Sequence, residues 1–285
     1  KSYPTIVKFN APLYEVVDCK KIHLFVPDEK LSCPIVIKDR ETKEDVDFEM
    51  TEEIKKMTDE VISYNESFKD VLIEFNGEPI PSLEYKRSFS GDLYKGGRLF
   101  AHGGSIQLLP EKYRLEYLTL DKEPIVEVDY KAIHPNIMYE LISLDKPMYA
   151  KLARKGFDPY CADTSFLEID EKAIALHKMK FGITKYDPVR KLYKRSLLMA
   201  INCKSDVQTR NTISQELYKD SKLDEKDREF VGINKPNIAL ILEALSEHNS
   251  AISDYFYKDY GVVLQNLDSK IALRVIEILL QEGQT

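Results

Sequence analysis

The apolar residues of this 285-residue chain change their period partway along the sequence. Up to about residue 128 they occur in short runs interrupted by Pro, Gly and charged residues, a pattern typical of strands and turns. Beyond that point they recur every three or four residues over longer segments, which is typical of amphipathic helices. Strands followed by many helices predict an α+β fold.

Strands are expected at 5–9, 21–26, 33–37 and 125–128, with further strands and turns across 71–95. Asn76-Gly77 and Ser90-Gly91 are the turn signals in that last region. A helix is expected to begin at Thr51, because Glu52 and Glu53 follow it and acidic residues favour a first helical turn. Later helices are expected at 133–144, 148–156, 170–180, 187–203, 206–220, 236–256 and 265–281.

Composition excludes several classes of protein. Hydrophobic residues make up 43% of the chain, which is too many for a disordered protein. No stretch approaches 18 consecutive apolar residues, so no membrane span is expected. The four cysteines form no CxxC pair and no short cluster with histidine, which argues against a zinc ribbon or a disulfide scaffold. A reducing compartment is therefore expected, such as the cytoplasm of a bacterium or of a phage-infected cell.

The net charge of −7 argues at first against a polyanion partner, but the charges are unevenly distributed. Residues 39–60 hold ten Asp/Glu and four Lys/Arg, whereas 185–210 holds seven Lys/Arg and two Asp/Glu. Within that basic stretch Arg190, Lys194 and Leu198 are spaced by four and share one face of a helix. Two readings stay open: a solvated basic face, or a pair of cations that holds a triphosphate.

Two further segments carry residues suited to phosphate chemistry. The apolar run 125–128 ends in Asp129, and a strand that ends in a carboxylate can present it to Mg²⁺, which prefers oxygen ligands. The alternative for Asp129 is a helix N-cap. Gly96-Gly97 allows close backbone approach before Arg98, and Gln107 and Arg114 could donate hydrogen bonds to bases or phosphates.

Taken in order, these segments resemble the polymerase domain of family A DNA polymerases, the bacterial polymerase I type. That family has Thr-Gly-Arg-Leu with a Gln nine residues after the Arg and a Pro three residues further, and Arg98, Gln107 and Pro110 keep these intervals. Its first metal-binding motif corresponds to Asp129-Tyr130-Lys131-Ala132-Ile133-His134-Pro135-Asn136. Its fingers helix corresponds to Arg190, Lys194, Leu198, Asn202 and Cys203, and a later helix to the segment that starts at Gln265.

The resemblance implies a right-hand polymerase with the following parts: an N-terminal accessory or thumb-like region (1–95), a palm (96–145), mostly helical fingers (146–260) and a palm re-entry helix (261–285). The implied activity is DNA-directed DNA polymerisation, with primer–template DNA and deoxynucleoside triphosphates as partners and Mg²⁺ as cofactor. A phage or mobile element is the expected origin, and no membrane partner is expected.

The resemblance also implies roles for single residues. Asp129 and the carbonyl of Tyr130 would bind two Mg²⁺ ions, and Lys194 would protonate the leaving pyrophosphate. The implied nucleotide-binding residues are Tyr130, His134, Tyr160, Arg190, Lys194, Leu198 and Asn202. The implied contacts to primer and template are Arg98, Gln107, Arg114 and Gln265.

This chain departs from the family at several of these positions. His134 replaces a Glu that crowds the sugar 2′ carbon, so sugar selectivity stays open. Leu198 replaces an aromatic residue, and Asn202-Cys203 replaces Tyr-Gly. No His-Asp pair supplies the second catalytic carboxylate, so the chain is expected to be a fragment that is inactive by itself. Two alternatives remain: a template-independent or priming nucleotidyltransferase, and an inactive nucleic-acid-binding remnant.

Overall fold

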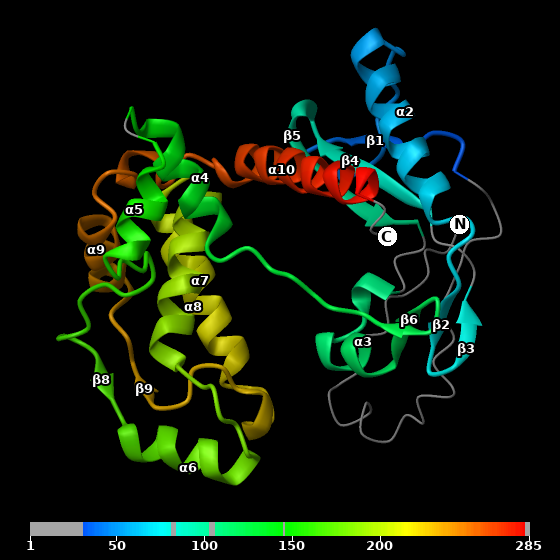
Figure 1. The fold of residues 1–285 in the computed structure, drawn as a ribbon. Helices are drawn as coiled ribbons and strands as arrows, with labels where there is room; N and C mark the ends of the chain where they lie inside the picture. Colours follow the sequence, from blue (N-terminus) through cyan, green and yellow to red (C-terminus); the bar gives the residue numbers. More distant parts are fainter. Residues whose placement is uncertain (1–30, 81–83, 103–105, 145, 283–285) are drawn as a thin grey trace. The chain divides into compact units, whose positions relative to one another are not determined.

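The computed structural model describes residues 31–80, 84–102, 106–144 and 146–282, and it divides into two compact units (Figure 1). The first unit takes its described residues from Lys1–Asp129 and Ser269–Thr285, and the second is Tyr130–Asp268. Sheets and helices together confirm the expected α+β class. Within the described ranges, no helix has both the length and the apolar character needed to cross a membrane.

One sheet of the first unit has the strand order β1-β4-β5, formed by Ile35–Lys38, Tyr85–Ser90 and Asp92–Ala101. Strand β1 runs parallel to β4, and β4 runs antiparallel to β5. Helix α2 (Glu52–Ser67) contacts β1 and β4, and it buries Ile54 and Val61 with Phe89 of the sheet. Gly97 has a φ of +83°, and a Cβ added there would lie 2.5 Å from Cε1 of Phe89. Gly97 therefore lets the Phe89 ring pack against the backbone of β5.

A second sheet has the order β3-β2-β6-β7, in which all neighbouring pairs are antiparallel. Its strands are Ile73–Phe75 (β2), Glu78–Ile80 (β3), Leu118–Leu120 (β6) and Glu123–Pro124 (β7). The Asn76-Gly77 turn that joins β2 to β3 has positive φ at both residues, as a tight hairpin requires. The 3-10 helix η2 (Ile106–Leu108) and helix α3 (Glu111–Tyr117) precede β6.

The second unit is mainly helical, with α7 at the centre of its core (Figure 1). Helices α8 and α9 pack against α7, whose buried face includes Leu192, Tyr193, Leu197 and Ile201. The elements are α4 (Ile133–Ile142), α5 (Met148–Arg154), β8 (Glu168–Ile169), α6 (Glu171–Phe181), α7 (Pro188–Asn202), α8 (Asp206–Asp220), η3 (Glu225–Asp227), β9 (Ile233–Asn234), α9 (Ile238–His248) and η4 (Ser253–Tyr255). Helix α10 (Gly261–Gln281) begins in this unit and ends in the first.

Most expected helices are confirmed, with ends that differ by a few residues. The helix expected at 236–256 ends at His248, and the one expected at 265–281 starts earlier, at Gly261. The strand expected at 125–128 is wrong: β7 ends at Pro124, and 125–130 has no regular structure. Val126 and Val128 are 85% and 88% exposed, and no described strand pairs with this run. The strands expected at 5–9 and 21–26 lie outside the described residues.

Replacing Thr51 with alanine should lower the free energy of unfolding by about 1 kcal/mol. The Thr51 hydroxyl oxygen accepts a hydrogen bond from the Ile54 backbone N–H at 3.3 Å, and alanine leaves that donor without its cap. Urea denaturation followed by circular dichroism measures the change. Thr51→Ser is the matched control, because it keeps the cap and should behave as the wild type. Equal stability of all three proteins would contradict the capping role.

Candidate functional site

Helix α7 carries Arg190, Lys194 and Leu198, which their spacing places on one helical face, and also Asn202, which the resemblance assigns to the same helix. It begins where Asp187 caps the helix by accepting a hydrogen bond from the Arg190 backbone N–H at 2.8 Å, and Pro188 occupies the first helical position. Lys194 is exposed, whereas Arg190, Leu198 and Asn202 are half-buried. The predicted shared face is confirmed in this respect: it is the solvent-accessible side of a helix whose opposite side is core.

Arg190 lies next to Tyr160, and both are residues that the resemblance assigns to nucleotide binding. The guanidinium carbon lies 5.1 Å from the centroid of the Tyr160 ring, within the range of a cation–π contact. Arg190 also donates hydrogen bonds from Nε (3.0 Å) and Nη2 (2.9 Å) to Oδ2 of Asp158. Tyr160 is buried, so its ring forms a fixed support below the cation.

Asp158 determines the electrostatics of this cluster. Burial by itself would lower the pKa of Arg190, but the hydrogen bond and charge of Asp158 outweigh it and raise that pKa. Burial, followed by the charge of Asp158, raises the pKa of the neighbouring Cys161 thiol. His248 binds the backbone oxygen of Asp158 at 2.8 Å and stacks on the Phe157 ring. His248 thus anchors the loop that carries Asp158.

Several other cations of the basic stretch 185–210 are also paired with carboxylates. Lys191 and Arg195 both reach Glu229, Arg195 also reaches Glu216, and Arg210 pairs with Asp206. Lys194 forms no ion pair with any residue that the structure describes. Lys194 is therefore the cation of this face best placed to take an external anion.

The C-terminal end of α7, where Leu198 and Asn202 lie, makes its contacts within the protein. Nδ2 of Asn202 donates to the Leu198 carbonyl oxygen at 2.6 Å. A Cβ added to Gly261 would lie 1.8 Å from Oδ1 of Asn202, so glycine is needed where α10 begins. Backbone N–H groups of residues 257 and 260 donate to the carbonyls of Ala200 and Ile201 in the last turn of α7, and that of residue 259 donates to the carbonyl of Cys203, which follows the helix. Asn202 therefore joins α7 to the start of α10.

His134 contacts Asp268, a partner that the sequence position of His134 did not reveal. It lies in the first turn of α4, 7% exposed, with Nε2 2.9 Å from Oδ2 of Asp268 on α10. The residue before α4, Ala132, has a φ of +53°, which turns the chain sharply into the helix. A sugar-contacting role for His134 stays a prediction, and the structure adds that Asp268 orients the ring.

Asp129 and Tyr130 lie in the segment that enters α4, and both are exposed. Within the described residues there is no group of three or more His, Cys, Asp or Glu side chains arranged to hold a metal ion. One carboxylate and one carbonyl fit only a Mg²⁺ ion that keeps most of its waters and shares phosphate oxygens. The metal-binding roles of Asp129 and Tyr130 stay predictions.

The predicted primer and template contacts occupy varied settings. Arg98 is half-buried on β5, and Oε1 of Gln107 accepts a hydrogen bond from the Ala101 N–H at 3.0 Å. Arg114 on α3 donates from Nη2 to Glu127 at 2.8 Å, and that hydrogen bond raises the pKa of the guanidinium. Gln265 is half-buried within α10. The charge of Arg114 is thus matched by the Glu127 carboxylate.

Sequence spacing does not reveal two of these contacts, the one between Asp158 and Arg190 and the one between Asp268 and His134. Asp158 precedes its partner Arg190 by 32 residues, and His134 and Asp268 are 134 residues apart. Only the packing of the unit brings each pair together. Comparison of the chain with protein-family models, curated proteins and solved structures found no significant match in any of the three.

Proposed function

We propose that this chain is part of a Mg²⁺-dependent DNA polymerase that transfers nucleotides to a primer 3′ hydroxyl. The reaction is attack of the hydroxyl on the α-phosphate of a deoxynucleoside triphosphate, with pyrophosphate as the leaving group. Arg190 and Lys194 hold the triphosphate, and Lys194 gives a proton to the departing pyrophosphate. When bound, Mg²⁺ supplies neutralising charge on the phosphates.

The observation that carries the proposal is the arrangement of Arg190 on α7. Its guanidinium lies over Tyr160, and its side chain is 35% exposed, so phosphate oxygens can reach it. Lys194 stands one helical turn further along the same face. Asp158 already satisfies Arg190 with a carboxylate, so a nucleotide binds by exchanging one oxyanion for another at that cation.

A second candidate, a remnant that binds nucleotides without transferring them, is favoured by the environment of Asp129. A catalytic carboxylate needs a rigid support, and 125–130 has no regular structure. The two candidates share nucleotide binding and differ in primer extension. In a longer protein that supplies the second catalytic carboxylate, incorporation that is lost on Asp129→Ala supports the polymerase, whereas nucleotide binding without incorporation supports the remnant.

Arg190→Ala should weaken the binding of a deoxynucleoside triphosphate about tenfold or more. The variant removes charge-assisted hydrogen bonds, each worth about 1.5–3 kcal/mol. Titration of the intact chain with a fluorescent nucleotide in the presence of Mg²⁺ measures the dissociation constant. Arg195→Ala is the matched control, because Arg195 lies on the same helix but pairs with Glu216 and Glu229.

Asp158→Asn gives a test of opposite sign. It keeps the shape of the side chain while weakening its competition for Arg190, so nucleotide binding should become tighter. A gain in affinity cannot arise from misfolding. If Arg190→Ala binds as Arg195→Ala does and Asp158→Asn brings no gain, Arg190 is not a phosphate ligand and the proposal fails.

A further inference from the structure

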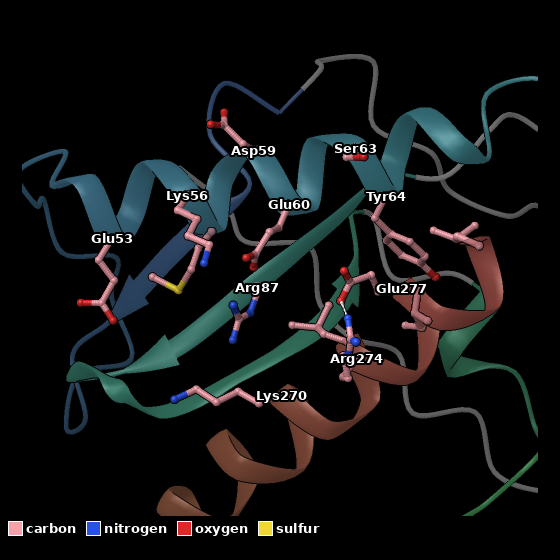
Figure 2. Close-up of a pocket in the computed structure, with 14 residues that line it drawn as sticks. Glu53, Lys56, Asp59, Glu60, Ser63, Tyr64, Arg87, Lys270, Arg274 and Glu277 are labelled. Atoms are coloured by element: carbon pink, nitrogen blue, oxygen red, sulfur yellow. Dashed lines mark hydrogen bonds and ion pairs between the residues drawn. The ribbon is translucent and has the colours of Figure 1, made fainter. Parts of the chain in front are cut away.

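A cavity of about 690 Å³ lies within the first unit, lined by α2, by Arg87 of β4 and by the C-terminal half of α10 (Figure 2). This volume is in the range of pockets that hold small organic ligands. Part of the lining is apolar, with Met57 from α2 and Leu273 and Ile276 from α10. The remainder carries charges of both signs.

Arg87 lies on β4 among these lining residues and is 2% exposed. Its Nε donates a hydrogen bond to the Gly97 carbonyl oxygen at 2.9 Å, and its guanidinium carbon lies 4.9 Å from the centroid of the Phe89 ring. These two contacts fix the plane of the guanidinium. Nη2 is buried and has no hydrogen-bond partner among the residues that the structure describes. A buried donor without an acceptor costs about 1–3 kcal/mol, and more when it is charged, so an acceptor is expected there.

The protein matches the charge of Arg87 only in part. Burial lowers the pKa of Arg87, and the charge of Glu60 on α2 opposes that effect. Figure 2 shows Glu60 extending from α2 toward Arg87. Arginine nevertheless stays a cation in proteins. Glu60 therefore supplies nearby negative charge but leaves the hydrogen bond at Nη2 unmade.

Two lysines bring further positive charge to a lining that has four basic and four acidic side chains in all, the acidic ones being Glu53, Asp59, Glu60 and Glu277. Lys56 comes from α2 and Lys270 from α10, and both side chains are exposed. Arg274 also lines the cavity, but it is paired with Glu277. The buried and fixed guanidinium of Arg87 is therefore the group that binds an anion in one geometry. The exposed lysines have flexible side chains that can adjust to anions of different shapes.

We propose that this cavity binds a small molecule that carries an oxyanion, either a phosphate ester or a carboxylate, on an apolar body. The oxyanion accepts a hydrogen bond from Nη2 of Arg87. Its negative charge then balances the Arg87 cation in place of Glu60. The apolar body rests against Met57, Leu273 and Ile276. This site belongs to the first unit, whereas Arg190 and Lys194 belong to the second, so it is a ligand site separate from the nucleotide clamp.

Isothermal titration calorimetry of the intact chain tests the site with four probes. Phenyl phosphate and benzoate carry the two oxyanions on one aromatic body, inorganic phosphate lacks the body, and phenol lacks the charge. Phenyl phosphate, benzoate or both should bind at least tenfold more tightly than phenol and inorganic phosphate. The tighter of the two identifies the oxyanion class. If neither binds more tightly than phenol, the proposal is overturned.

Three variants connect the binding to Arg87. Arg87→Gln should weaken binding of the preferred probe about tenfold or more, and Glu60→Gln should tighten it. Lys55→Ala is the matched surface control, because Lys55 is exposed on α2 and does not line the cavity. This variant should bind the probe with the same affinity as the wild-type protein. If Arg87→Gln does not fold, Glu60→Gln decides, since it leaves Arg87 in place. An affinity that Glu60→Gln fails to raise would refute the site.

Discussion

Replacing Tyr193 with alanine should lower the free energy of unfolding by about 3–5 kcal/mol, among the largest losses expected for one side chain. Tyr193 is 0% exposed at the centre of α7, and its hydroxyl donates a hydrogen bond to the backbone oxygen of Asp163. The truncation leaves a cavity in the core. It also removes the hydrogen-bond donor of the Asp163 carbonyl oxygen. Urea denaturation followed by circular dichroism measures the loss.

Two variants separate these contributions. Tyr193→Phe keeps the ring and removes only the hydroxyl, so it should cost about 1–2 kcal/mol. Tyr218→Ala is the surface control, because Tyr218 is 65% exposed on α8 and its loss should change stability by about 0.5 kcal/mol or less. Equal costs for Tyr193→Ala and Tyr218→Ala would mean that α7 is not the centre of this core.

Gly232→Ala should cost about 2–5 kcal/mol, because the new methyl group is both strained and obstructed. Gly232 has a φ of +86°, a conformation that alanine adopts at a cost of about 1–2 kcal/mol. The added Cβ would also lie 2.5 Å from Cγ1 of Ile174 and 2.9 Å from the Asp170 backbone oxygen. The backbone oxygen cannot swing away, since the Asp170 N–H is itself bonded to the Gly232 oxygen at 2.7 Å.

Gly156→Ala isolates the strain from the collision. Gly156 has nearly the same φ, +87°, but nothing lies within 4 Å of the position a Cβ would take. It should therefore cost only about 1–2 kcal/mol, and the difference between the two variants measures the collision. Thermal unfolding of both variants gives this difference. Identical losses would show that space around Gly232 is not limiting.

The helices of this protein are largely predictable because their signals are local. Asp187 before Pro188 begins α7, and Asp170 and Asn237 accept hydrogen bonds from the first N–H groups of α6 and α9. Apolar spacing then marks the buried face of each helix. Both signals lie within a few residues of one another, so the sequence contains them in full.

The strand expected at 125–128 shows where local pattern is insufficient. Ile125-Val126-Glu127-Val128 has strong strand propensity, but a strand exists only when a neighbouring strand accepts its hydrogen bonds. No partner pairs with it within the described residues, and its valines face solvent. The expected support for Asp129 is therefore absent from the first unit as described, and its catalytic role stays a prediction.

Local sequence patterns predict the α+β class, most of the helices to within a few residues, and the common face of Arg190 and Lys194 on α7. Which charges are matched depends on tertiary packing: Asp158 binds Arg190, Asp268 binds His134, and Arg87 is buried with one donor that has no partner among the described residues. The physical reason is range. Helix formation depends on neighbours along the chain, whereas burial and ion pairing depend on which distant segments the folded chain brings within a few ångströms.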